Sequence, residues 1–147
     1  NDSEESPLKG LRVLDCGCGT GILGIASSRL GASEVIGYDI DEWSVKNTLH
    51  NAKLNNTDNI KALLGDASVV KTIKGQFDIV LANINRNILL NDMAVMRSKM
   101  ALNAILILSG FYEDDVPMLV AKAKSLDLSL MRQKVKGNWR CLVFKAL

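Results

Sequence analysis

The strongest constraint on the fold is the stretch from Val13 to Gly24, where a short apolar run leads into alternating glycines. It reads Val-Leu-Asp-Cys-Gly-Cys-Gly-Thr-Gly-Ile-Leu-Gly. The apolar residues 11–14 predict a short buried strand, the glycines a turn too tight for side chains, and residues 22–30 a helix. A strand that leads through such a turn into a helix places backbone N–H groups at the strand's carboxyl end. This edge is where open α/β sheets bind nucleotide-like ligands.

Composition places the chain among soluble single-domain proteins. It has 147 residues, 48% of them apolar and 23% charged, and a net charge of +2 that argues for neither nucleic-acid nor membrane binding. No apolar run is long enough to span a bilayer, and no secretory leader is visible. The three cysteines lack metal or redox spacing, which favours reduced thiols in a cytoplasmic protein without a metal site.

The rest of the chain predicts alternating strands and helices. Ile22, Ile25 and Ala26 are expected to face inward from the first helix, with Gly24 allowing a close approach to the sheet, and Asp41 is expected to cap the second helix. Strands are predicted at 34–39, 60–64, 77–82 and 104–109, and helices at about 41–54, through Leu89, Met93, Met96 and Met100, and from Pro117.

The end of the chain changes period. Apolar residues recur at every second position in 126–130 and again in 139–143, on either side of Gly137-Asn138. Two strands joined by so short a connection must be antiparallel. Five β/α units followed by a hairpin predict a single doubly wound α/β sheet.

Two ligands compete for the glycine turn. Gly19-x-Gly21-x-x-Gly24 matches the dinucleotide fingerprint, which alone is a weak signal. Asp15, however, lies two positions before the first glycine, where an uncompensated carboxylate would repel a pyrophosphate. Such a carboxylate suits a ligand with a cationic portion, such as the ammonium and sulfonium of S-adenosylmethionine.

Two further acids follow predicted strands at the same edge of the sheet. Asp39 ends the second strand, where a carboxylate accepts both hydroxyls of a ribose, and Asp66 follows the third, where it can accept the exocyclic amine of an adenine. Each has a simpler interpretation: Asp39 or Asp41 as a helix cap, and Asp66 as a turn former. Three acids on one rim together favour an adenosyl ligand.

The run from Val13 to Leu23 resembles the first motif of the class I S-adenosylmethionine-dependent methyltransferases. More narrowly, the chain is similar to the PrmA type, which methylates amino groups of a large-subunit ribosomal protein. The similarity covers the chain from about Leu11 to its end. Besides the first motif, the matching parts are Ile36–Asp41, Leu81–Ile84, Leu108–Gly110 and Trp139. The first motif is specific to the class, whereas the pairs Asn83-Ile84 and Ser109-Gly110 narrow it to the family and are less specific.

The resemblance implies a Rossmann-like, doubly wound, seven-stranded sheet of order 3-2-1-4-5-7-6 with the last strand antiparallel. It implies S-adenosylmethionine as cofactor, S-adenosylhomocysteine as product and Asn83 as the catalytic residue that faces both cofactor and acceptor amine. The implied cofactor-binding residues are Asp15, Gly17, Cys18, Gly19, Thr20, Gly21, Asp39, Ile40, Asp66, Ala67 and Asn83.

Two departures from the family stand out. The amino-terminal substrate-recognition domain and the His/Thr-containing loop before the first strand are absent, and Asn85 stands where many relatives carry an apolar residue. We therefore expect residues 1–9 to be a linker or tag remnant and residues 10–147 to be the catalytic domain. The expected partner is a ribosomal protein substrate, with no membrane and no direct nucleic-acid binding.

The chemistry needs few groups, because a sulfonium leaves as a neutral thioether and positioning supplies most of the acceleration. The acceptor amine must be neutral, and the Asn83 side-chain oxygen with nearby backbone carbonyls can accept its N–H groups; a simpler role for Asn83 is a helix cap before Arg86.

Several alternatives stay open. Methyltransferases acting on base amines usually carry Asn/Asp-Pro-Pro-aromatic, which Asn83-Ile84-Asn85-Arg86 does not match. A small-molecule N-methyltransferase, a cofactor-binding fragment without independent activity and a nicotinamide-dependent oxidoreductase are the others, the last disfavoured by Asp15.

Overall fold

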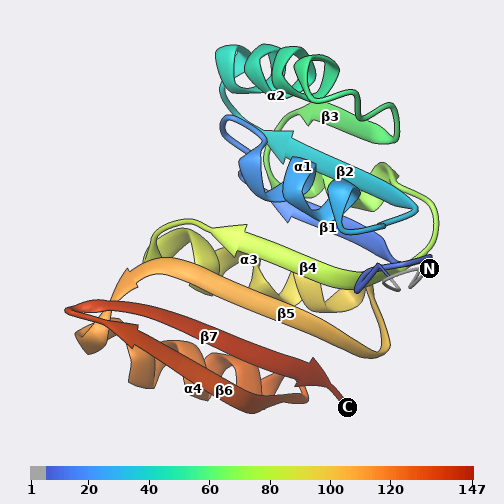
Figure 1. Cartoon of the computed structure of the whole chain (residues 1–147). Helices are drawn as coiled ribbons and strands as arrows, with labels where there is room; N and C mark the ends of the chain where they lie inside the picture. The colour runs from blue at the N-terminus through green and yellow to red at the C-terminus, as the bar shows by residue number, and fades with distance from the viewer. Residues whose placement is uncertain (1–5) are drawn as a thin grey trace.

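The computed structural model describes residues 6–147 as a seven-stranded sheet with helices on both faces (Figure 1). The strand order is β3-β2-β1-β4-β5-β7-β6. The first five strands are parallel to their neighbours, and β7 runs antiparallel to both β5 and β6. The predicted fold class and strand order are confirmed. The strands are β1 (Arg12–Cys16), β2 (Glu34–Asp39), β3 (Ile60–Leu64), β4 (Phe77–Asn83), β5 (Met100–Tyr112), β6 (Leu128–Lys136) and β7 (Trp139–Ala146).

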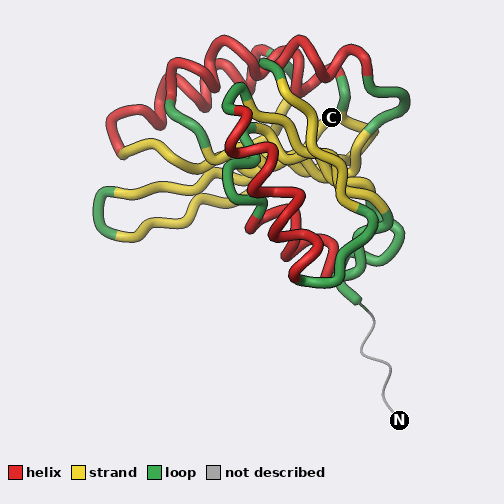
Figure 2. Tube along the Cα trace, turned by 90° about the horizontal axis from the view of Figure 1, so that it is seen from above, coloured by secondary structure: helices red, strands yellow, loops and turns green. Residues whose placement is uncertain are grey.

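The strands form a layer between helices (Figure 2). Helices α1 and α2 pack against β1, β2 and β3, whereas α3 and α4 cover the opposite face over β5 and β6. The third crossover is a 3-10 helix instead of an α-helix. The helical segments are α1 (Ile22–Arg29), α2 (Glu42–Leu54), η1 (Ala67–Thr72), α3 (Arg86–Ser98), η2 (Glu113–Asp115) and α4 (Val116–Ser125).

The core has two unequal parts, because successive residues of a strand point to opposite faces of the sheet. On β1, Leu14 joins the large apolar cluster under α3 and α4, whereas Val13 joins a small cluster near α1. Both residues are fully buried. Central parallel strands covered on both faces therefore read as continuous apolar runs in the sequence.

The inward face of α1 was only partly predicted. Ile25 is buried, but Ile22 is 71% exposed and Ala26 is also exposed, so the expectation for these two residues is wrong. The reason is the close approach predicted at Gly24, which is confirmed: a Cβ there would lie 3.0 Å from Cγ1 of Val35. The helix rests on the sheet through Gly24 and its neighbours, which turns Ile22 to the rim.

Met100 does not continue the preceding helix as its spacing suggested. Helix α3 ends at Ser98, and Met100 is the first residue of β5, paired with Phe77. Met100 is nevertheless 2% exposed. Burial on the helical face and burial on the strand require the same apolar side chain, so the pattern could not separate them.

The start of the described chain contacts the domain. The Leu8 backbone N–H donates to the Leu30 carbonyl at 3.0 Å, and Leu8 packs against the small apolar cluster. Residues 1–5 of the expected linker lie outside the described residues. In the part of the chain from residue 6 onward, no helix is long and apolar enough to cross a membrane.

The methionine row of α3 predicts a measurable contrast. Met93 is fully buried, so Met93→Ala is expected to lower the free energy of unfolding by about 2–5 kcal/mol through lost burial and a cavity. Met131, 57% exposed on β6, is the matched control, and its substitution by Ala should change stability by less than about 0.5 kcal/mol. Urea denaturation of both variants measures this, and equal losses would contradict the assigned core.

Candidate functional site

The carboxyl ends of β1, β2, β3 and β4 meet at one edge of the sheet, where a cleft of about 870 Å³ opens between η1 and α3. Its size is ordinary for a cofactor or small-molecule site. Its lining residues are Gly17, Tyr38, Asp39, Ile40, Gly65, Asp66, Ala67, Ser68, Lys71, Ile84, Asn87, Ile88, Asn91, Asp92 and Val95. Five of the predicted site residues are therefore brought together here: Gly17, Asp39, Ile40, Asp66 and Ala67.

The glycine turn after β1 requires glycine for two reasons. Gly17, Gly19 and Gly21 all have positive φ, at 68°, 56° and 85°. A Cβ at Gly17 would lie 2.8 Å from Cγ2 of Ile84, and one at Gly21 would lie 2.9 Å from Cγ2 of Thr48. The turn is thus wedged between the loop after β4 and helix α2, while the position of a Cβ at Gly19 is open.

Asp39 holds the turn against the end of β2. Its Oδ2 accepts a hydrogen bond from the Gly19 N–H at 3.0 Å, and its Oδ1 accepts one from the Asp41 N–H at 2.9 Å. Asp41 is the N-cap of α2, as predicted, and accepts from the Trp43 N–H at 3.0 Å. The cap is therefore supplied by Asp41, and each Asp39 oxygen keeps a lone pair for a further donor.

Asp66 has the turn-forming geometry that was the simpler interpretation of this residue. Its Oδ1 accepts from the Ser68 N–H at 2.9 Å, so the side chain caps η1. The hydrogen bonds from Ser68 lower the pKa of the Asp66 carboxyl, so it is ionised near neutral pH. The side chain also lines the cleft, and only Oδ1 is used in the cap.

Asp15 lies behind the glycine turn instead of in the cleft. It is 3% exposed, and the Gly24 N–H in the first turn of α1 donates to its carboxylate. Burial raises the pKa of Asp15 to about 6, the Gly24 hydrogen bond opposes this, and the charge of Asp39 adds to it. Of the three acids predicted for one rim, Asp39 and Asp66 thus share the cleft, and Asp15 supports the turn from inside.

The remaining turn residues also lie outside the cleft lining. Cys18 is buried, its N–H donates to the Tyr38 carbonyl at 2.9 Å, and its sulfur accepts from the Thr48 hydroxyl at 3.3 Å. Thr20 is exposed, and its carbonyl accepts from the Asn51 amide at 2.9 Å. Burial raises the pKa of the Cys18 thiol, so it stays protonated and unreactive. Cofactor roles for Asp15, Cys18, Gly19, Thr20 and Gly21 stay predictions.

Asn83 ends β4 at the same edge, with an exposed side chain whose oxygen is held in place. Its Oδ1 accepts a hydrogen bond from the Ser109 hydroxyl at 3.2 Å. A Cβ at Gly110 would lie 2.8 Å from that Oδ1, so only glycine fits beneath it. Asn83 is not the cap of α3, because Asn85 takes that place and accepts from the Ile88 N–H at 3.1 Å. The role of Asn83 in catalysis stays a prediction.

One wall of the cleft was missed in the sequence. It consists of the α3 residues Asn87, Ile88, Asn91, Asp92 and Val95. Their spacing of three and four places them on one helical face, but a mixed polar face next to a buried methionine row looks like a solvated surface. Tyr38 was also missed, because its position within β2 indicated a core residue.

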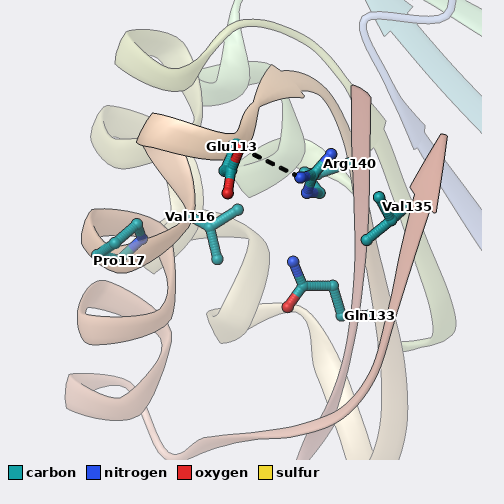
Figure 3. Close-up of a pocket in the computed structure, with 6 residues that line it drawn as sticks. All are labelled: Glu113, Val116, Pro117, Gln133, Val135 and Arg140. Atoms are coloured by element: carbon teal, nitrogen blue, oxygen red, sulfur yellow. Dashed lines mark ion pairs between the residues drawn. The ribbon is translucent and has the colours of Figure 1, made fainter. Parts of the chain in front are cut away.

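A second cavity, of about 480 Å³, lies between α4 and the β6–β7 hairpin (Figure 3). Arg140, 8% exposed, points into it, donates to the Gly137 carbonyl at 2.7 Å and pairs with Glu113 at 3.4 Å. This cavity shares no lining residue with the carboxyl-edge cleft. Among residues 6–147, no group of three or more His, Cys, Asp or Glu side chains is placed to hold a metal ion.

A family model described as ribosomal protein L11 methyltransferase (PrmA) matches residues 3–146. The chain belongs to this family. Relatives called ribosomal protein L11 methyltransferase share 49% identity over 137 residues in Porphyromonas gingivalis and 44% over 140 residues in Phocaeicola vulgatus. These matches cover 93% and 95% of the chain but 47% and 50% of the relatives. The chain therefore spans about half the length of the curated relatives it matches.

Solved structures agree with the PrmA assignment. The crystal structure of a ribosomal protein L11 methylase from Lactobacillus delbrueckii subsp. bulgaricus matches with a TM-score of 0.88 and 29% identity over 98% of this chain and 74% of that one. Magnesium protoporphyrin IX methyltransferase from Synechocystis, with bound SAM, matches with a TM-score of 0.73 at 23% identity over 96% of this chain and 72% of that one. The second likeness concerns the fold alone.

The buried Asp15 carboxyl predicts a pH dependence of stability. Its pKa is about 6 in the folded protein against 3.8 for an ordinary aspartate, so between these values the folded state holds a proton that the unfolded chain has lost. The contribution of Asp15 to the free energy of unfolding therefore falls as pH rises through this window, by at most about 3 kcal/mol, and is constant above it.

Asp15→Asn tests this pH dependence, because the amide oxygen still accepts from Gly24 but does not titrate. Above pH 7, the variant is expected to be more stable than the parent protein by about 1–3 kcal/mol, and the difference should vanish near pH 4. Urea denaturation across this range measures the difference curve. A difference that is constant with pH would contradict the raised pKa.

Gly17→Ala and Gly19→Ala form a matched pair. Both substitutions force alanine to a positive φ, which costs roughly 1–2 kcal/mol, but only the Gly17 variant also brings a Cβ to 2.8 Å from Ile84. Gly17→Ala is therefore expected to lower the melting temperature more than Gly19→Ala. Differential scanning calorimetry checks the order, and equal losses would show that Ile84 moves freely.

Proposed function

We propose that this chain binds S-adenosylmethionine in the carboxyl-edge cleft and transfers its methyl group to an amine of a large-subunit ribosomal protein. The observation that carries the proposal is the cleft itself, with the Asp39 and Asp66 carboxylates at neighbouring strand ends and the fixed Asn83 oxygen at β4. Membership of the PrmA family supports it. Because the chain spans half of its relatives, both substrate and activity are part of the proposal.

The residues of the cleft fit the parts of an adenosyl cofactor. Each Asp39 oxygen has a free lone pair beside the glycine turn, which suits the two ribose hydroxyls. Asp66 and Ala67 would flank the base, with the exposed Ile40 side chain covering it. The methionine end would lie along Gly17 and Gly19, over the turn that Cys18, Thr20, Gly21 and the buried Asp15 shape.

The cofactor, when bound, supplies an electrophilic methyl group on a sulfonium. The chain's task is to present a neutral amine in line with the carbon–sulfur bond. The Asn83 Oδ1 accepts one hydrogen bond from Ser109 and retains a second acceptor site for an amine N–H. An acceptor at this position orients the nitrogen lone pair toward the methyl group, and a partly desolvated site lowers the pKa of the incoming ammonium.

The partner follows from the names of the relatives, which are ribosomal protein L11 methyltransferases. The proposal extends this substrate class to the present chain and places it in the cytoplasm, where such a substrate is made. Whether residues 1–147 hold the polypeptide without further sequence is decided by assay. Methylation of ribosomal protein by this chain is to be compared with that by a chain of the relatives' length.

Calorimetry tests the cofactor part of the proposal. Titration with S-adenosylmethionine, S-adenosylhomocysteine and NAD is expected to give saturable binding of the first two alone. Saturable binding of NAD would favour the oxidoreductase instead, and binding of S-adenosylmethionine without transfer to any ribosomal protein would favour a cofactor-binding fragment.

Asn83→Ala tests the acceptor site. The variant should keep its affinity for S-adenosylhomocysteine within about twofold and lose turnover by about 10²-fold or more, because orientation of the amine and not cofactor binding depends on this oxygen. The matched control is Asn55→Ala at the C-terminal end of α2, which should retain full turnover. Calorimetry and a tritium-transfer assay on ribosomal protein give the two quantities, and unchanged turnover would remove Asn83 from the site.

A further inference from the structure

The hydroxyl of Tyr38 is buried in the wall of the carboxyl-edge cleft without a hydrogen-bond partner. Tyr38 is 4% exposed, and its oxygen is the one buried side-chain polar atom in residues 6–147 that lacks a partner. Buried hydroxyls in folded proteins are almost always paired, because leaving one unpaired costs free energy. Since Tyr38 also lines the cleft, a bound molecule can supply the missing partner.

The position of Tyr38 separates it from the ribose-facing acid. Tyr38 and Asp39 are consecutive on β2, so their side chains leave opposite faces of the strand. Asp39 turns to the glycine loop through Gly19, whereas Tyr38 belongs to the apolar cluster on the α3 side. A nucleoside with its ribose at Asp39 would therefore extend its base toward Tyr38 and α3.

Asp92 of α3 faces the same cleft. Its Oδ1 accepts from the neighbouring Asn91 amide at 2.8 Å, and no hydrogen bond to Oδ2 is formed within residues 6–147. Burial raises the pKa of the Tyr38 hydroxyl, and the nearby Cys16 thiol and Asp92 charge raise it further. Tyr38 is thus a protonated donor, and Asp92 offers a free carboxylate oxygen as acceptor.

A donor beside an acceptor matches one edge of adenine. Adenine presents a ring-nitrogen acceptor next to its exocyclic amine donor, whereas hypoxanthine and guanine carry an oxygen acceptor at the place of the amine. A carboxylate oxygen would accept from the amine and repel the oxygen. The pair therefore discriminates between bases as well as adding affinity.

We propose that Tyr38 and Asp92 recognise the adenine base of the cofactor, with the Tyr38 hydroxyl donating to a ring nitrogen and Asp92 Oδ2 accepting from the exocyclic amine. This inference rests on the proposed function, since it takes the cofactor to be S-adenosylmethionine. Recognition of the amine then comes from the α3 wall, while Asp66 at the rim is engaged in capping η1.

Tyr38→Phe and Asp92→Asn test the proposal with two probes, S-adenosylhomocysteine and its inosyl analogue, by calorimetry on the whole chain. Tyr38→Phe is expected to weaken S-adenosylhomocysteine about fivefold to tenfold, the size of one buried hydrogen bond. Asp92→Asn, whose amide can donate or accept, is expected to abolish most of the preference for the adenosyl over the inosyl probe. The melting temperature of the ligand-free Tyr38→Phe protein should rise, because an unpaired buried hydroxyl is removed.

Ser27→Ala is the matched control. Ser27 is a buried hydroxyl, 6% exposed, that is already paired with the Leu23 carbonyl at 2.8 Å and does not line the cleft. Its substitution should lower the melting temperature and leave both dissociation constants unchanged. The control thus separates a loss of stability from a loss of ligand contact.

Two results would overturn the inference while sparing the proposed function. One is parental affinity of Tyr38→Phe for S-adenosylhomocysteine together with an unchanged or lower melting temperature, which would mean that water satisfies the hydroxyl. The other is an unchanged preference between the two probes in Asp92→Asn. Failure of the parent protein to bind S-adenosylhomocysteine at all would overturn both the inference and the proposed function.

Discussion

The hydrogen bond from the Gly19 N–H to Asp39 Oδ2 holds the functional edge of this molecule together. It joins the turn after β1 to the end of β2, two adjacent parallel strands whose connection otherwise runs through the whole of α1. With the Cys18 N–H donating to the Tyr38 carbonyl, the turn extends the sheet's hydrogen bonding past the last paired residues. The rim of the cleft is therefore as fixed as the sheet beneath it.

Much of the fold could be predicted because its signals are local. Buried parallel strands read as apolar runs, glycine marks turns that require positive φ, and a period-two pattern around Gly137 marks the hairpin. Errors arose where two structures bury the same residue, as for Met100, or where one contact sets the rotation of a helix, as Gly24 does for Ile22. Both depend on distant packing that spacing along the chain does not record.

The candidate site divides in the same way. Asp39 and Asp66 were predicted because residues at the ends of parallel strands meet at one edge, which topology alone guarantees. The depth of Asp15 and the α3 wall could not be predicted, because each depends on the angle at which a helix crosses the sheet. A polar face such as that of Asn87 and Asn91 becomes a cleft wall only once η1 stands opposite to it.

Ile84 connects the two halves of the site. Its Cγ2 lies where a side chain on Gly17 would begin, it lines the cleft, and it directly follows Asn83, whose oxygen rests over Gly110. A molecule that fills the cleft presses on the same residue that tethers the acceptor-side amide. Occupancy of one compartment is thereby communicated mechanically to the other, an arrangement that suits an ordered sequence in which cofactor enters first and the polypeptide follows.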